Sequence, residues 1–430
     1  MTDAYVDLWG RTIGAVSWFD DRQLAAFQYT EEFAGSGIQV APLTMPLRTA
    51  PYEFPELPRK SFKGLPGMLA DCLPDRFGNA LIDVWLAQQN RDASTFNPVE
   101  RLCYTGKRGM GALEFQPALK QSPTTARRIE VDSLVELSNR ILNQRSRMEG
   151  RFDGEDDSRV IEDILRVGTS AGGARAKAIL AWNEQTGEFR SGQVDAGKPF
   201  TYWLMKFDGI EGNKDKEIAD PQGYGRIEYA YYLMAQDAGI IMMPCRLHEE
   251  GGRAHFMTRR YDRTDTGGKL HYQSLAALAH HDFESAGAHS YEQAILVIKR
   301  LGLSTGDREQ QIRRAFFNII ARNQDDHVKN IGFLMDRKGL WRLSPAFDVV
   351  YSYNPQGNWT SQHQMSLNGK RDDFTRADLL AFAKMAGMKS ARASRLIDEI
   401  RLAVRGWPKR AEDAGVDPDN AKRIASFHRL

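Results

Sequence analysis

The stretch NQDDHVKN, residues 323–330, separates two hydrophobic segments: IRRAFFNIIAR (312–322) precedes it and IGFLM (331–335) follows it. Both flanks have the apolar content of segments that are buried in a folded protein. The stretch itself consists mainly of side chains that carry charge or coordinate metals. Burying such groups is costly unless they are paired or bind a cation. The contrast predicts a functional loop that is held in place by the core.

Asp325 and Asn330 are separated by four residues, which is the spacing of a protein-kinase catalytic loop. In such a loop the Asp accepts the proton of the acceptor hydroxyl group and the Asn turns back to bind metal. Lys329 would steady the γ-phosphate or the base. His327 would orient the loop beside the nucleotide by hydrogen bonds, and proton transfer by His327 is the alternative. Asp348, in LSPAFDVVYS and at the end of an expected short strand, would supply a second oxygen to Mg²⁺. A lone Asp in a turn is usually structural, so the prediction of phosphoryl transfer depends on the joint pattern.

Lys206 lies within TYWLMKF (201–207), which is otherwise an apolar strand pattern. A charged side chain in such a strand needs a partner or a phosphate. Glu228, near the start of the next expected helix, is a candidate partner and would give the Lys–Glu pair of a kinase small lobe. The alternative is a lysine at a strand end that reaches water.

The segment GTSAGGARAK, residues 168–177, is rich in glycine and precedes an expected strand. Its Gly172, Gly173 and Ala174 would expose backbone N–H groups toward a phosphate. The GxxxxGK[ST] spacing of a Walker motif is absent. A tight turn without a ligand is the alternative interpretation.

The chain has 430 residues, more than one compact core usually holds. Its 42% hydrophobic and 27% charged content is ordinary for a globular protein, and a net charge of +2 argues against a polyelectrolyte that binds nucleic acid. Three scattered cysteines fit a reducing compartment. The start MTDAYVDLWG lacks the pattern of a signal peptide, and no run of roughly eighteen apolar residues is present. We therefore expect a cytoplasmic protein without a membrane span.

The pattern of apolar and polar residues along the chain predicts three regions. Residues 1–117 combine strand patterns with one helix, residues 118–260 combine strands with a long helix, and residues 261–430 are mainly helical. We therefore expect an α+β protein with a two-lobed, protein-kinase-like fold: a β-rich N-lobe, a helical C-lobe and an extra N-terminal β-rich subdomain.

Taken together, these stretches resemble the HipA family of bacterial serine/threonine toxin kinases, along nearly the whole chain. GRTIGAV, LADCLPDRFGNALID and GKRGMGALEF look like the small N-terminal subdomain of that family. SAGGARAK looks like its glycine-rich loop. SYEQAILVIKRLGL, NQDDHVKN, SPAFDVV and MSLNGKRDDF look like its helical lobe.

The resemblance implies roles for individual residues. Asp325 is the catalytic Asp, Asn330 and Asp348 hold Mg²⁺, and Lys206 contacts the ATP phosphates. Ser170 matches a loop serine whose autophosphorylation ejects the loop and disables ATP binding.

Family members carry a Glu-Arg-aromatic-Asp-Arg hinge, which here reads Arg259-Arg260-Tyr261-Asp262-Arg263. Because this Glu is missing, adenine would be contacted by Tyr261 and by the hinge backbone.

The resemblance also implies a biological role. The protein would be the toxin of a toxin–antitoxin pair, phosphorylating a translation component such as glutamyl-tRNA synthetase. Its partner would be a HipB-like helix-turn-helix antitoxin, through which it meets DNA only indirectly. Two alternatives stay open: a catalytically idle kinase-like scaffold in an antitoxin–DNA complex, and a small-molecule kinase.

Overall fold

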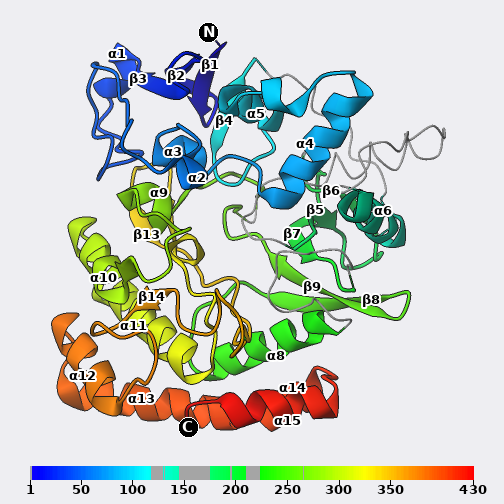
Figure 1. Ribbon diagram of the computed structural model, residues 1–430, viewed down its shortest axis with the longest axis vertical. Coiled ribbons are helices and arrows are strands. Elements are labelled where there is room, and N and C mark those ends of the chain that lie inside the picture. The colour runs from blue at the N-terminus through cyan, green and yellow to red at the C-terminus, as the bar shows by residue number, and fades with distance from the viewer. Residues whose placement is uncertain are drawn as a thin grey trace.

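The computed structural model describes most of the chain and shows three packed regions (Figure 1). The N-terminal subdomain lies at the top of this view, the small-lobe sheet on the right, and the helical lobe at the lower left, with the last helices of the chain along the base. The described residues are 2–117, 129, 131–144, 175–193, 196–209, 223–264 and 266–430. Within these ranges, none of the helices combines the length and the hydropathy of a segment that crosses a bilayer.

The N-terminal subdomain is built on a four-stranded antiparallel sheet in the order β3-β2-β1-β4. Strands β2 and β3 form a hairpin, because they pair directly across the turn that contains Asp20-Asp21. The strands are β1 (Thr2–Leu8), β2 (Arg11–Phe19), β3 (Leu24–Tyr29) and β4 (Leu113–Gln116). The helices are α1 (Glu31–Ala34), α2 (Arg59–Phe62), α3 (Gly67–Ala70), α4 (Arg76–Gln88), the 3-10 turn η1 (Ala93–Thr95) and α5 (Pro98–Thr105).

The small lobe is a five-stranded antiparallel sheet in the order β6-β5-β7-β9-β8. Helix α8 packs closely on β9: a Cβ atom on Gly225 would lie 2.1 Å from the carbonyl oxygen of Ala254, so only glycine fits there. The elements are α6 (Val131–Gln144), β5 (Lys177–Trp182), β6 (Phe189–Ser191), β7 (Thr201–Lys206), α8 (Tyr224–Asp237), β8 (Cys245–Glu250) and β9 (Arg253–Arg259).

The large lobe is helical, as expected, but it also contains five short strands that the sequence pattern does not predict. Strands β10, β12 and β13 form an antiparallel sheet, and β11 pairs with β14 in parallel. Runs of two to four residues are too short to show an alternating pattern. The strands are β10 (His271–Ser274), β11 (His289–Ser290), β12 (Gly332–Met335), β13 (Trp341–Leu343) and β14 (Met365–Ser366). The helices are α9 (Leu275–Ala279), α10 (Tyr291–Arg300), α11 (Thr305–Ile320), η2 (Val328–Asn330), α12 (Arg376–Met385), α13 (Ser390–Arg405), α14 (Trp407–Asp413) and α15 (Pro418–Phe427).

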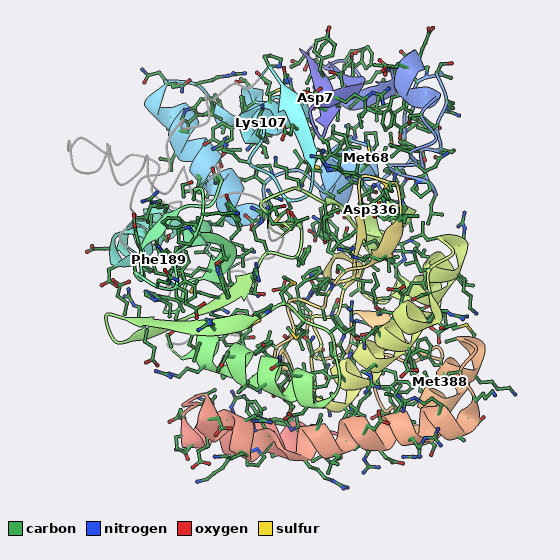
Figure 2. The ribbon with its side chains drawn as sticks, turned by 180° about the vertical axis from the view of Figure 1, so that it is seen from behind. Asp7, Met68, Lys107, Phe189, Asp336 and Met388 are labelled. Carbon is green, nitrogen blue, oxygen red and sulfur yellow. The ribbon has the colours of Figure 1, made fainter. Side chains whose placement is uncertain are left out.

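The N-terminal subdomain packs against both lobes. Phe77 and Leu81 of α4 belong to the same buried cluster as Ala178 and Met205 of the small-lobe sheet. On the other side, Met335 at the end of β12 belongs to the buried core of the subdomain. In the reverse view of Figure 2, the labelled Met68 and Asp336 mark this second boundary.

A buried ionic cluster fastens the subdomain to the segment between the lobes. Asp262 accepts hydrogen bonds from the guanidinium groups of Arg260 (2.6 Å) and Arg263 (2.7 Å), and from the backbone N–H of Gly111 (2.7 Å). Arg260 also donates to the carbonyl oxygen of Gly109 (3.3 Å). Burial raises the pKa of Asp262, but the two arginines outweigh it and hold that pKa well below its usual range.

Replacing Asp262 with alanine is expected to leave Arg260 and Arg263 buried without their shared carboxylate. Removing one partner from a buried charge network typically costs about 3–5 kcal/mol of folding free energy, so urea denaturation should begin at lower concentration. Asp398→Ala is the matched control, because Asp398 and Arg376 form an exposed bidentate pair and should contribute little. Equal shifts for both variants would contradict this role of Asp262.

Candidate functional site

The loop that contains Asp325 joins the end of α11 to β12, and its flanks are buried as the sequence predicts. The side chain of Asp325 is 42% exposed. One of its carboxylate oxygens accepts a hydrogen bond from the indole N–H of Trp359 (3.0 Å), and its backbone carbonyl accepts one from the amide group of Asn330 (2.8 Å). Nε2 of His327 lies 3.8 Å from the same carboxylate oxygen. Within the described part of the chain, the second carboxylate oxygen of Asp325 has no hydrogen-bond donor.

Asp348 lies in a loop rather than at the end of a strand, which corrects the sequence prediction. Strand β13 ends at Leu343, and Pro345 has no N–H group with which to continue the pairing. Ala346 makes a single bridge to Met242, and Asp348 itself has a φ of 52°. This left-handed conformation is rare outside glycine and is frequent at functional sites.

The loops of Asp325 and Asp348 are joined to each other. The amide group of Asn323 donates a hydrogen bond to the backbone carbonyl of Asp348 (3.4 Å). Asn330, His327 and Asp348 line one cavity at the junction of these loops.

Lys206 lies at the end of β7 and faces two carboxylates. Its ammonium group is 2.5 Å from the carboxylate of Glu228 in α8 and also pairs with Asp348. The second oxygen of Glu228 pairs with the guanidinium group of Arg175 (3.0 Å). Burial lowers the pKa of Lys206, and Asp348 and Glu228 outweigh this effect and raise it. The pairing of Lys206 with Glu228 corresponds to the arrangement that was expected from the sequence.

A cleft between the lobes connects these groups. It is lined by Lys206, Glu228 and Asp348, by the hinge residue Tyr261, and by Phe347, which stacks on Tyr261 with ring centroids 5.1 Å apart. Phe347 and Asp348 also line the neighbouring cavity that contains Asn330. The cleft therefore offers an apolar and aromatic section beside a charged section.

The donor groups fit a hard divalent cation. Asp348 offers carboxylate oxygens, and Asn330 uses its amide N–H group internally, which leaves its amide oxygen for a ligand. Mg²⁺ is commonly held by one or two protein oxygens together with substrate phosphates and water.

The cleft is also lined by residues that had no role in the sequence prediction, Lys177 and Met110 among them. Lys177 in β5 lies directly opposite Lys206 in the antiparallel register, so the two lysines share one face of the sheet. Lys177 pairs with Asp75 of the N-terminal subdomain (3.1 Å), and Met110 of that subdomain also lines the cleft. The sequence signal for Lys177 was a lysine in the otherwise apolar pattern AKAILAW. No sequence pattern pointed to Met110 or Asp75.

The remaining residues with predicted roles are Lys329, Ser170 and the glycine-rich segment. The ammonium group of Lys329 lies over the ring of Phe283, 4.4 Å from its centroid, and Lys329 is not among the residues that line the two cavities. Ser170 and the segment Gly172–Ala174 lie outside the described residues, so their predicted roles stay predictions.

Two protein-family models match this chain. Residues 4–116 match the HipA N-terminal domain, and residues 169–407 match the HipA-like C-terminal domain. The solved complex of HipA, HipB and operator DNA from Shewanella oneidensis MR-1 is similar with a TM-score of 0.68 and 18% identity, covering 99% of this chain and 94% of that chain. At that identity the similarity establishes the fold, and the predicted two-lobed α+β fold is confirmed.

Among curated proteins, Y4mE of Sinorhizobium fredii (strain NBRC 101917 / NGR234), whose name proposes a kinase, is 24% identical over 208 residues. The match covers 45% of this chain and 49% of that protein. The chain thus matches about half the length of this relative.

The Lys206–Asp348 pair predicts a pH dependence of stability. Burial raises the pKa of Asp348, but Lys206 and Lys177 outweigh it and lower the pKa to about 2, below the unfolded value of about 3.9. The ionised carboxylate therefore stabilises the folded protein above about pH 4, and this contribution is lost as the pH falls toward about 2. The Tm of Asp348→Asn should lie below that of the wild type at pH 7, and the difference should shrink in acid while both remain folded. Parallel curves of Tm against pH would contradict the pairing.

Proposed function

Because this chain belongs to the HipA family, we propose that it is an ATP- and Mg²⁺-dependent serine/threonine protein kinase that acts as the toxin of a toxin–antitoxin pair. The observation that supports this most directly is the convergence of Lys206, Glu228 and Asp348 with the loop of Asp325 and Asn330. These side chains come from both lobes, and phosphoryl transfer needs these groups in one place.

Each group has a role in this proposal. Lys206, oriented by Glu228, contacts the phosphates of ATP, and Tyr261 together with the hinge backbone contacts adenine. Asn330 and Asp348 would hold Mg²⁺, which would supply positive charge next to the phosphates. Asp325 accepts the proton of the acceptor hydroxyl group.

Asp325→Asn is expected to lower the rate of phosphate transfer by about 10²–10⁴-fold, because the amide cannot act as a general base. The measurement is incorporation of radioactive phosphate from labelled ATP, with circular dichroism to verify the fold. Asp419→Asn is the matched control, since the side chain of Asp419 is 94% exposed on α15. A folded Asp325→Asn variant with wild-type transfer would refute the assignment.

The acceptor is proposed to be a protein, and a component of translation such as glutamyl-tRNA synthetase is the first candidate. Incubating the protein with labelled ATP and a cell lysate tests this class. Labelled protein bands support a protein kinase, labelled metabolites indicate a small-molecule kinase, and nucleotide binding without transfer indicates an idle scaffold.

The proposed partner is a HipB-like helix-turn-helix antitoxin. The structurally similar chain from Shewanella oneidensis is described in a complex with HipB and operator DNA. For the present chain, DNA contact would be made only through such a partner.

Ser170 is proposed to be the site of inhibitory autophosphorylation. A phosphate there would add about −1.5 to −2 charges beside the nucleotide phosphates and repel them. After incubation with ATP, mass spectrometry should find phosphate on Ser170, and Ser170→Ala should keep its ATP affinity while the wild type loses it. Thr169→Ala, the neighbouring hydroxyl residue, is the control. Equal loss of affinity in the wild type and Ser170→Ala would exclude this switch.

A further inference from the structure

The second aspartate of the loop, Asp326, makes contacts quite different from those of Asp325. It is buried, and its carboxylate accepts three hydrogen bonds: from the hydroxyl group of Tyr291 (2.6 Å), from Nδ1 of His363 (2.7 Å) and from the backbone N–H of Gln364 (2.7 Å). Burial opposes ionisation of Asp326, but three hydrogen-bond donors favour the ionised carboxylate. Asp326 is therefore an ionised anchor beneath the loop.

The protonation of His363 follows from its second contact. Nε2 of His363 lies 2.9 Å from a guanidinium nitrogen of Arg429, and an arginine can only donate. Nε2 must therefore accept, so that the ring is neutral and its proton lies on Nδ1, facing Asp326. Arg429 is itself held by Asp372 and by the carbonyl oxygen of Ile319 (2.8 Å).

The segment anchored in this way also contacts the catalytic carboxylate. Residues 359–364 lie over the loop: Trp359 donates to Asp325, and the side chain of Gln324 donates to the carbonyl oxygen of Thr360 (3.2 Å). The side chain of Gln364 returns to the carbonyl oxygen of Trp359. The orientation of Asp325 thus depends on a segment whose far end is fixed by His363 and Gln364.

We propose that Arg429 is a positioning residue for phosphate transfer. By fixing the neutral Nδ1–H form of His363, it holds residues 359–364 against Asp326, and Trp359 then orients the carboxylate of Asp325. The proposal rests on the function proposed above, but its structural part, the protonation of His363, is independent of any enzymatic activity.

Nuclear magnetic resonance of the full-length protein with ¹⁵N-labelled histidine tests the structural part. The two-bond ¹H–¹⁵N spectrum at neutral pH should show His363 as a neutral ring with its proton on Nδ1, and the signal is assigned by its loss in His363→Gln. An imidazolium ring, or a proton on Nε2, would overturn the proposal. This result stands even if no phosphate transfer is found, so it separates a failure here from a failure of the proposed function.

Kinetics test the positioning role. Arg429→Leu should lower kcat by about 10- to 100-fold, the scale on which small misplacements act, while the Kd for ATP stays unchanged because Lys206 and Tyr261 are not touched. Arg429→Lys, which can still donate to Nε2, should recover much of the rate. Arg395→Gln, an exposed arginine on α13, is the control.

A double variant separates positioning from general stabilisation. If Arg429 acts through Trp359, then Arg429→Leu combined with Trp359→Phe should be no slower than the slower single variant, because the two changes break the same path. Fully multiplicative losses in kcat, or a parallel loss of ATP affinity in Arg429→Leu, would overturn the proposal. If Arg429→Leu fails to fold, the proposal is tested by the spectrum of His363 and by the rate of Arg429→Lys.

Discussion

The ammonium group of Lys206 lies between two carboxylates, and the geometry of the cleft depends on this contact. Lys206 ends β7, Glu228 lies in α8, and Asp348 lies in the large lobe, so one cation ties three elements together. Leaving any of these charges buried and unpaired would cost several kcal/mol, roughly 3–5 by analogy with other buried pairs. The pairing therefore favours one relative placement of the lobes. It also keeps Asp348 ionised, which is the form that can bind a metal.

The N-terminal subdomain is part of this arrangement rather than an appendage. Asp75 neutralises Lys177 on the face of the sheet that carries Lys206, and Met110 adds an apolar side chain to the cleft. The cluster around Asp262 fixes the backbone beside Met110 to the hinge. Replacing Asp75 would therefore alter the charge balance of the cleft, and replacing Met110 would alter its wall.

Much of the local structure was predictable. The hairpins at Asp20-Asp21 and at Gly251-Gly252, the apolar strands β5 and β7, and the long helices carry turn residues or periodic patterns that act over a few neighbours. The two-lobed kinase-like fold followed from these patterns and from the family resemblance. The short strands of the large lobe did not, because their pairing depends on distant partners rather than on their own two to four residues.

The reactive groups could be listed from the sequence: the spacing of Asp325 and Asn330, the lysine in an apolar strand and the aspartate Asp348. Which of these charges meet depended on the packing of the folded chain. The pairing of Asp75 with Lys177, the indole of Trp359 on Asp325, and the path from Arg429 through His363 to Asp326 join segments far apart in the chain. The reason is physical: an ionic or hydrogen-bonded contact depends on a few ångströms of separation and on shared burial, and packing of the whole chain sets both.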